Sequence, residues 1–180
     1  MPEGAWLLAF VTAQRLGELV LAQRNTAALL ARGAVEFGAG HYPLMVTMHA
    51  AWLIGLWALA YSHPVDPFWL AVFALLQAAR VWVIASLGER WTTRIIVLPG
   101  QQPVARGPYR FLRHPNYAVV ACEIAVVPLA LGLWLYAAVF FALNLAMLGL
   151  RIRTENAALS AASTGPSVTP ANLANPERTL

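Results

Sequence analysis

Residues 118–150 form a continuous apolar run in which Glu123 is the only charged side chain. In a single α-helix this run would extend about 50 Å, at about 1.5 Å per residue. The hydrocarbon core of a bilayer is about 30 Å thick and is crossed by about 20 residues. Pro128 and Gly132 lie near the middle of the run, where a turn would divide it into two short spans. The run therefore predicts a transmembrane helical hairpin.

Polar residues gather on both sides of this run, and a hairpin would bring the two groups together. Arg151 and Glu155 would return to the membrane face at which His114 and Tyr117 enter, whereas one long helix would leave them on opposite faces. The hairpin therefore predicts one polar site made from two distant parts of the chain. The flanking polar residues are Arg106, Tyr109, Arg110, Arg113, His114 and Tyr117 before the run, and Arg151, Arg153 and Glu155 after it.

The rest of the chain predicts an all-α integral membrane protein with about five transmembrane helices. Hydrophobic residues make up 59% of the 180 residues and charged residues 11%, against about 45–50% and about 25% in soluble domains. We expect one membrane-embedded domain over 1–160 and a disordered tail over 161–180, where Ala, Ser, Thr, Pro and Asn predominate. A short cytoplasmic helix should begin near Leu150. The predicted spans are 4–23, 43–61, 67–87, 117–131 and 133–150.

The polar connections set the expected orientation. Most arginines lie in 24–42, in 88–116 and after residue 150, while 62–66 and 131–133 hold none. The positive-inside tendency then places the N-terminus outside and the polar site in the cytoplasm. All twelve basic residues are Arg and Ala is abundant, which indicates a GC-rich bacterial genome and hence the inner membrane. Within the longest connection, 94–100 has β-branched residues before Pro-Gly and predicts a short extended segment.

Several polar residues fall inside the predicted spans and need partners there. Arg15 and Glu18 are three residues apart and can pair on one helical face. Arg80 should pair with an acid in the interior, and both Glu18 and Glu123 remain open as that partner. His49 is expected to be a hydrogen-bonded histidine of the core.

The expected partners are membrane lipids and a lipophilic small molecule. The net charge of +4 comes mostly from arginines beside the membrane, so nucleic acid is a poor explanation. No metal site is expected, because Cys122 is the single cysteine, and because His41 and His49 are on different sides of a helix start. The oligomeric state is left open.

Three stretches together resemble the isoprenylcysteine carboxyl methyltransferase family of integral membrane enzymes. They are GPYRFLRHPNY (107–117), the hydrophobic hairpin, and RIRTENAAL (151–159). The family pattern is roughly GPY, a few residues, RHPxY, a hairpin, and R-x-x-x-E-E followed by Leu. More loosely, 14–25 and 36–49 are similar to a bacterial branch that includes methyltransferases acting on alkylpyrone-type lipids.

The resemblance implies an S-adenosylmethionine-dependent O-methyltransferase. The acceptor oxygen would be a carboxylate or acidic hydroxyl on an isoprenylcysteine-like, alkylpyrone-like or alkylresorcinol-like molecule dissolved in the membrane. Arg151 would be the catalytic residue facing this acceptor. Asn156 stands where the family often has a second Glu, so this chain lacks a carboxylate at that position. The donor-binding residues implied by the resemblance are Gln101, Gln102, Pro103, Val104, Tyr109, His114, Pro115, Asn116, Tyr117 and Glu155.

These residue types suit such chemistry. Tyr faces attract a sulfonium cation, and a carboxylate such as Glu155 suits the donor's ammonium group or hydroxyls. The planar fork of Arg151 can hold a carboxylate or enolate. Methyl transfer to an anion then needs mainly alignment and exclusion of water.

Four other interpretations remain open at this point. The Arg and His clusters are also typical of topology signals and headgroup contacts, and Arg151 with Glu155 of a helix-surface ion pair. An NADPH-dependent enzyme of the membrane sterol-reductase type is a second enzymatic candidate. A non-catalytic membrane scaffold is the fourth.

Overall fold

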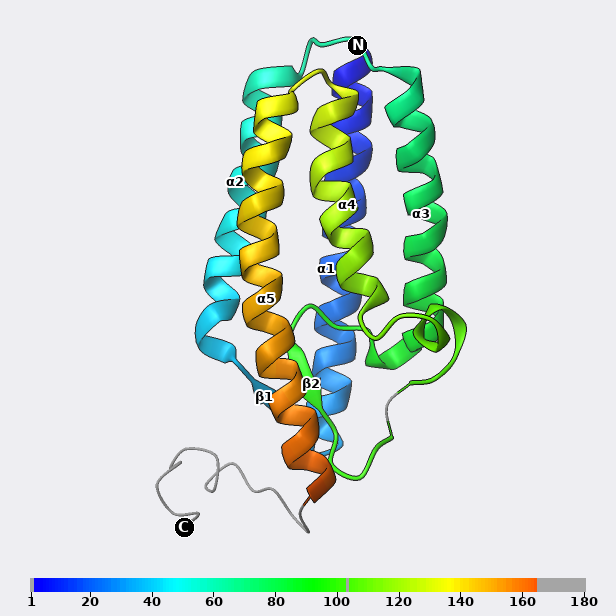
Figure 1. Ribbon diagram of the computed structural model, residues 1–180, viewed down its shortest axis with the longest axis vertical. Helices are drawn as coiled ribbons and strands as arrows, with labels where there is room; N and C mark the ends of the chain where they lie inside the picture. The colour runs from blue at the N-terminus through cyan, green and yellow to red at the C-terminus, as the bar shows by residue number, and fades with distance from the viewer. Residues whose placement is uncertain (1, 103, 165–180) are drawn as a thin grey trace.

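The computed structural model describes residues 2–102 and 104–164, with side chains placed up to Ser160. Five α-helices run along its long axis (Figure 1). The N-terminus and the two short helix connections lie at the upper end, and two short strands and the long connection before α4 lie at the lower end (Figure 1). The helices are α1 (Glu3–Ala31), α2 (Tyr42–Ala60), α3 (Pro67–Leu87), α4 (Pro115–Ala130) and α5 (Trp134–Thr164).

The predicted all-α membrane fold and its hairpin are confirmed. By length and composition, α1, α2, α3 and α5 can each cross a bilayer, and α4 is a shorter apolar helix. Helices α4 and α5 pack against each other as the two arms of the hairpin (Figure 1). The extended segment expected within 94–100 is β2 (Ile95–Val97), which pairs antiparallel with β1 (Val35–Phe37). The sequence did not predict this partner strand.

Two helix boundaries differ from the prediction. Helix α1 continues to Ala31, into the stretch 24–42 that was expected to be a loop, because 24–32 contains no Gly or Pro. Helix α5 runs unbroken to Thr164. The short helix expected from Leu150 is therefore a continuation of the last span and not a separate element. Of the predicted tail 161–180, the first four residues continue α5, and 165–180 lie outside the described residues.

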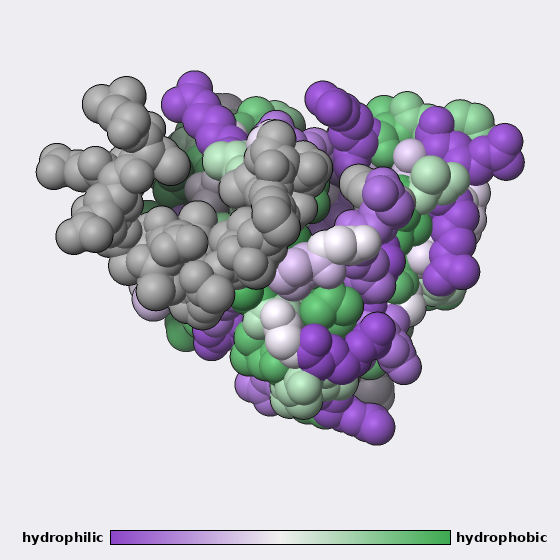
Figure 2. Space-filling view, turned by 90° about the horizontal axis from the view of Figure 1, so that it is seen from below, coloured by the Kyte–Doolittle hydropathy of each residue, from purple (hydrophilic) through white to green (hydrophobic). Residues whose placement is uncertain are grey.

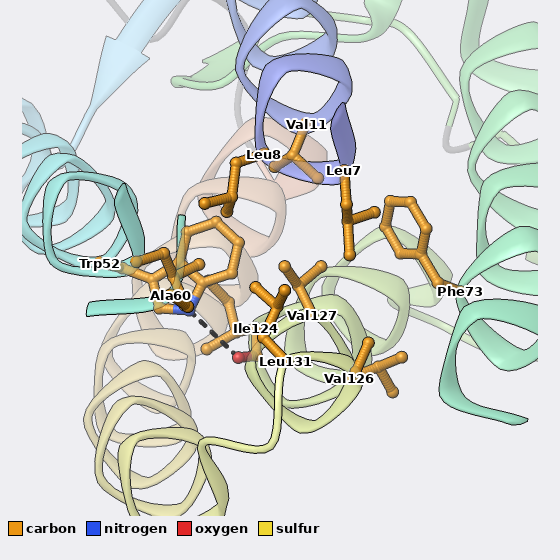
Figure 3. Close-up of a cluster of buried hydrophobic side chains, with 12 residues drawn as sticks. Leu7, Leu8, Val11, Trp52, Ala60, Phe73, Ile124, Val126, Val127 and Leu131 are labelled. Carbon is orange, nitrogen blue, oxygen red and sulfur yellow. Dashed lines mark hydrogen bonds between the residues drawn. The ribbon is translucent and has the colours of Figure 1, made fainter. Parts of the chain in front are cut away.

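Pro128, near the end of α4, explains one contact of the apolar core. Proline has no N–H, so the carbonyl of Ile124 loses the hydrogen bond that the fourth residue along would normally give it. The indole Nε1 of Trp52 donates to this carbonyl at 3.2 Å (Figure 3). A backbone carbonyl inside a bilayer needs a hydrogen-bond donor from within the protein. The indole of Trp52, on α2, supplies the donor that α4 lacks. The side chains around this contact are Leu7, Leu8, Val11, Leu56, Ala60, Phe73, Val126, Val127, Ala130 and Leu131.

The turn of the hairpin is fixed by the connection between α2 and α3. The ring Nδ1 of His63 lies 2.8 Å from the carbonyl oxygen of Leu131, and the N–H of Asp66 donates to the carbonyl of Ala130 at 2.8 Å. Gly132 takes a positive φ of 75°, which a glycine adopts without strain. With the turn held at the upper end, α5 must return toward the lower end where α4 began.

Four charged side chains pair inside the helix bundle, and we call Arg15, Glu18, Arg80 and Glu123 the intramembrane charge network. Nε of Arg80 lies 2.8 Å from Oε1 of Glu123 and 3.3 Å from Oε1 of Glu18. The two Nη atoms of Arg15 reach Glu18 at 2.9 Å and Glu123 at 2.6 Å. The predicted Arg15–Glu18 pair is therefore present, and Arg80 contacts both acids that the sequence had left open.

Candidate functional site

Two cavities meet toward the lower end of the bundle. The membrane cavity, of about 270 Å³, lies among α1, α2, α4 and α5 and is mostly apolar. The interface cavity, of about 140 Å³, lies beside β2 and the lower parts of α4 and α5. A group at this shared boundary can therefore face an apolar chamber on one side and a more polar one on the other. The residues that line both cavities are Thr92, Asn116, Tyr117 and Arg151.

Arg151 is the charged residue at the boundary. Its side chain is 4% exposed. One Nη donates to the carbonyl of Thr93 at 2.9 Å and the other lies 3.1 Å from the sulfur of Met45. Among the described residues it forms no ion pair with a carboxylate, Glu155 included. A buried guanidinium held only by neutral groups can still bind an anion.

Glu155 faces the interface cavity from the next turn of α5 and is held by two aromatic residues of the α4 start. The hydroxyl of Tyr117 donates to its Oε2 at 2.6 Å, and Nδ1 of His114 lies 3.8 Å from the same oxygen. The His114 and Tyr117 rings stack with centroids 5.4 Å apart, and the Arg151 guanidinium lies 5.7 Å from the Tyr117 ring centroid. The helix-surface ion pair between Arg151 and Glu155, which was one of the alternative interpretations of the sequence, is not formed.

Most of the residues expected in the site are brought together, and some are not. Tyr109, His114, Asn116, Tyr117, Arg151 and Glu155 all line the interface cavity. Gln101 and Gln102 are exposed and, like Val104, line neither cavity. Pro115 is buried at the start of α4 and lines neither. Pro103 lies outside the described residues.

The connection before α4 is held by a side chain of α1 and packs closely against α3. Nδ2 of Asn25 donates to the carbonyl of Trp91 at 2.8 Å, and Nε1 of Trp91 donates to Oδ1 of Asn116 at 3.3 Å. Gly107 has a φ of 57°, and a Cβ there would meet Oγ of Ser86 at 2.1 Å. This close approach requires glycine and places the following Tyr109 against the cavity.

Other cavity residues were not expected from the sequence. Met45, Thr92 and Thr93 contact Arg151 or line the same wall. Met45 is one of many apolar residues of α2, and Thr92 and Thr93 are short side chains in a connection, so none of them gives a distinctive pattern. Arg90 and Arg94 line the interface cavity. Arg94 pairs with Glu36 at 2.8 Å, whereas Arg90 donates to the backbone carbonyl of Gln102 at 2.7 Å.

Two ionisable side chains that line the interface cavity, outside the membrane spans, have shifted pKa values. Burial, and then the negative charge of Glu155, raise the pKa of Tyr109 above its ordinary value, so this phenol stays protonated. Burial, and then neighbouring arginines, lower the pKa of Arg90. Much of the described surface at this end is hydrophilic (Figure 2). The interface cavity thus offers a carboxylate, protonated tyrosines and guanidinium groups at a polar face of the protein.

One family model and two curated relatives match this chain. The model of the isoprenylcysteine carboxyl methyltransferase family matches residues 69–161. The uncharacterized protein YpbQ of Bacillus subtilis is 39% identical over 160 residues, which cover 86% of this chain and 95% of YpbQ. An uncharacterized protein of Haemophilus influenzae is 28% identical over 163 residues, covering 84% of this chain and 92% of that protein. No solved structure matches.

Proposed function

This chain belongs to the isoprenylcysteine carboxyl methyltransferase family, and on that basis we propose that it is a membrane methyltransferase that uses S-adenosylmethionine. The acceptor is a lipophilic molecule dissolved in the bilayer, methylated on a carboxylate or an acidic hydroxyl. The observation that carries the proposal is Arg151, which is buried and has no carboxylate partner among the described residues. A guanidinium in this state suits an anionic acceptor oxygen.

The interface cavity fits the donor by its chemistry. When bound, S-adenosylmethionine supplies an electrophilic methyl group on a positively charged sulfur. Glu155 can accept hydrogen bonds from the donor's ammonium or hydroxyl groups, and Arg90 can pair with its carboxylate. The faces of Tyr109, His114 and Tyr117 offer aromatic surface, which attracts a nearby cation by about 0.5–2 kcal/mol for tyrosine. A donor role of 101–104, which the family resemblance implies, stays a prediction.

The membrane cavity fits the acceptor. Its wall is mostly apolar, so a hydrocarbon tail can lie among α1, α2 and α5 while the acceptor oxygen reaches Arg151. Arg151 then holds the oxyanion at the wall that the two cavities share, where it can be aligned with the donor and shielded from water. The oxyanion forms the new bond to the methyl carbon as the carbon–sulfur bond breaks, so an already ionised acceptor requires no proton transfer.

The orientation belongs to the same proposal. With the interface cavity on the cytoplasmic side of a bacterial inner membrane, and the N-terminus outside, the donor is reached from the compartment that makes it. The arginine-rich connections then lie in the cytoplasm, as the positive-inside tendency favours.

Ligand binding by the purified protein tests the proposal. Calorimetry with S-adenosylmethionine should show saturable binding, and NADPH should show none. Transfer of a labelled methyl group into a bacterial lipid extract should depend on the wild-type protein. Binding of NADPH and not of S-adenosylmethionine would favour the reductase and overturn the proposal.

A further inference from the structure

Asn144 is a buried polar residue on α5 for which the described residues supply no hydrogen-bond partner. It lies on α5 between apolar neighbours and is 0% exposed. Neither its Nδ2 nor its Oδ1 has a hydrogen-bond partner among the described residues. An amide left unpaired in an apolar interior destabilises the fold, and nearly all buried polar groups in native proteins are paired. This amide borders the membrane cavity, so a cavity ligand is a natural source of the missing partner.

A second unpaired group borders the same cavity. Nε of Arg15 is buried and makes no hydrogen bond to any part of the chain that the structure describes. Both Nη atoms of this arginine are already occupied by Glu18 and Glu123. The two arginines and two glutamates of the intramembrane charge network carry no net charge in their ionised forms. What remains on this part of the wall is therefore hydrogen-bonding capacity for a neutral group.

Asn144 and Arg151 lie on the same helix, so their spacing limits how far apart they can hold two groups of one ligand. Seven residues separate them on one uninterrupted helix, which is about two turns, so both lie on the same face. The separation along the helix axis is about 10 Å. Met147 lies between them and also lines the cavity, and a methionine side chain can readily move to admit a ligand.

We propose that the membrane cavity contains a second polar subsite, formed by Asn144 and Nε of Arg15, for a neutral hydroxyl or carbonyl group of the lipid acceptor. Asn144 and Arg151, which would hold the two polar groups, are about 10 Å apart along the axis of α5. The acceptor is therefore a lipid with a polar substituent partway along its tail, not one with a plain alkyl or prenyl tail. This inference rests on the proposed function for its reacting end and adds the class of substrate.

Matched fatty acids test the subsite. Stearate and a mid-chain hydroxystearate share a carboxylate and a chain length and differ only in one hydroxyl. The wild-type protein should bind the hydroxystearate about fivefold to tenfold more tightly, as one hydrogen bond to an otherwise unpaired buried amide predicts. In Asn144→Leu, which keeps side-chain size, the preference should disappear. Leu143→Ala, at an exposed position on the same helix, should retain it.

The outcomes separate this inference from the proposed function. Equal affinity for the two fatty acids in the wild type, or binding of neither, overturns the subsite even if S-adenosylmethionine binds normally. The same holds if the preference survives in Asn144→Leu. A hydroxyl preference that depends on Asn144 supports the subsite even if no methyl transfer is found. The wild-type comparison alone is decisive if Asn144→Leu does not fold, since it needs no variant.

Discussion

Arg80 and Arg151 are equally buried, at 3% and 4% exposure, but their surroundings differ. Arg80 contacts two carboxylates and belongs to a network in which two arginines face two glutamates. Arg151 contacts a backbone carbonyl and a thioether sulfur. Since an unpaired charge in a low-dielectric interior is costly, the first arrangement is complete without a ligand and the second is not. Burial of a charge alone therefore does not distinguish the two arginines, and the missing counter-charge is the reason why we propose Arg151, and not Arg80, as a ligand-binding residue.

The largest effect should follow removal of one member of the intramembrane charge network. Glu123→Ala leaves Arg80 without its closest partner and should reduce the free energy of unfolding by about 3–5 kcal/mol. Denaturation of the purified protein in mixed micelles would measure this change. The double variant Arg80→Met with Glu123→Leu should recover a part of the loss, because no unpaired member of that pair remains. A single variant as stable as the wild type would contradict the structural role of the network.

Arg151→Ala should reduce methyl transfer far more than it reduces stability. Methyl transfer should fall by about a hundredfold or more, because the group proposed to hold the acceptor oxygen is lost. Donor affinity should be largely retained, and the free energy of unfolding should change far less than in Glu123→Ala. Initial rates in proteoliposomes, together with a melting curve, separate these quantities. Arg153→Ala, an exposed arginine on the same helix, is the matched control and should behave like the wild type.

Glu155→Ala should produce a smaller and different change. It removes the acceptor of the Tyr117 hydroxyl and the carboxylate of the interface cavity, so affinity for S-adenosylmethionine should fall about tenfold, or about 1.4 kcal/mol. Calorimetry measures this affinity directly. Asn156→Ala, at the neighbouring exposed position, should leave it unchanged. If both variants bind the donor as the wild type does, Glu155 does not contact it.

For the smallest effect, we expect that ionisation of Tyr109 does not change donor affinity near neutral and mildly alkaline pH. Burial and the charge of Glu155 raise the pKa of Tyr109 above its ordinary value of about 10. Donor affinity should therefore be insensitive to Tyr109 ionisation between about pH 7.5 and about pH 9.5. Titrations in the wild type and in Tyr109→Phe should run parallel over this range. An alkaline loss of affinity that disappears in Tyr109→Phe would show that the phenol ionises there.

The sequence predicted the hairpin because Pro128 and Gly132 are local turn signals. It also predicted that the polar residues at the two ends of the run would meet, because a hairpin returns both ends to the same membrane face. These residues are His114, Tyr117, Arg151 and Glu155. The sequence could not predict the Trp52 bond to Ile124, which depends on how α2 packs against α4.

Other contacts were beyond local patterns as well. Met45 and Thr93 reach Arg151 through tertiary packing of separate segments. The proximity of Glu18 and Glu123, which lets Arg80 contact both, likewise depends on how α1, α3 and α4 pack. Asn144 did carry a usable signal, as an amide within an apolar run and two helical turns from Arg151.

The shortness of α4 has a consequence for where the reaction takes place. Its 16 residues span about 24 Å, against a hydrocarbon thickness of about 30 Å. Because the hairpin turn is tied level with the α2–α3 connection, the shortfall falls at the other end, where His114 and Tyr117 lie. Such hydrophobic mismatch is relieved by thinning the leaflet or by drawing water and headgroups inward. The donor would therefore descend to the lipid, and the acceptor could be modified without being lifted out of the membrane.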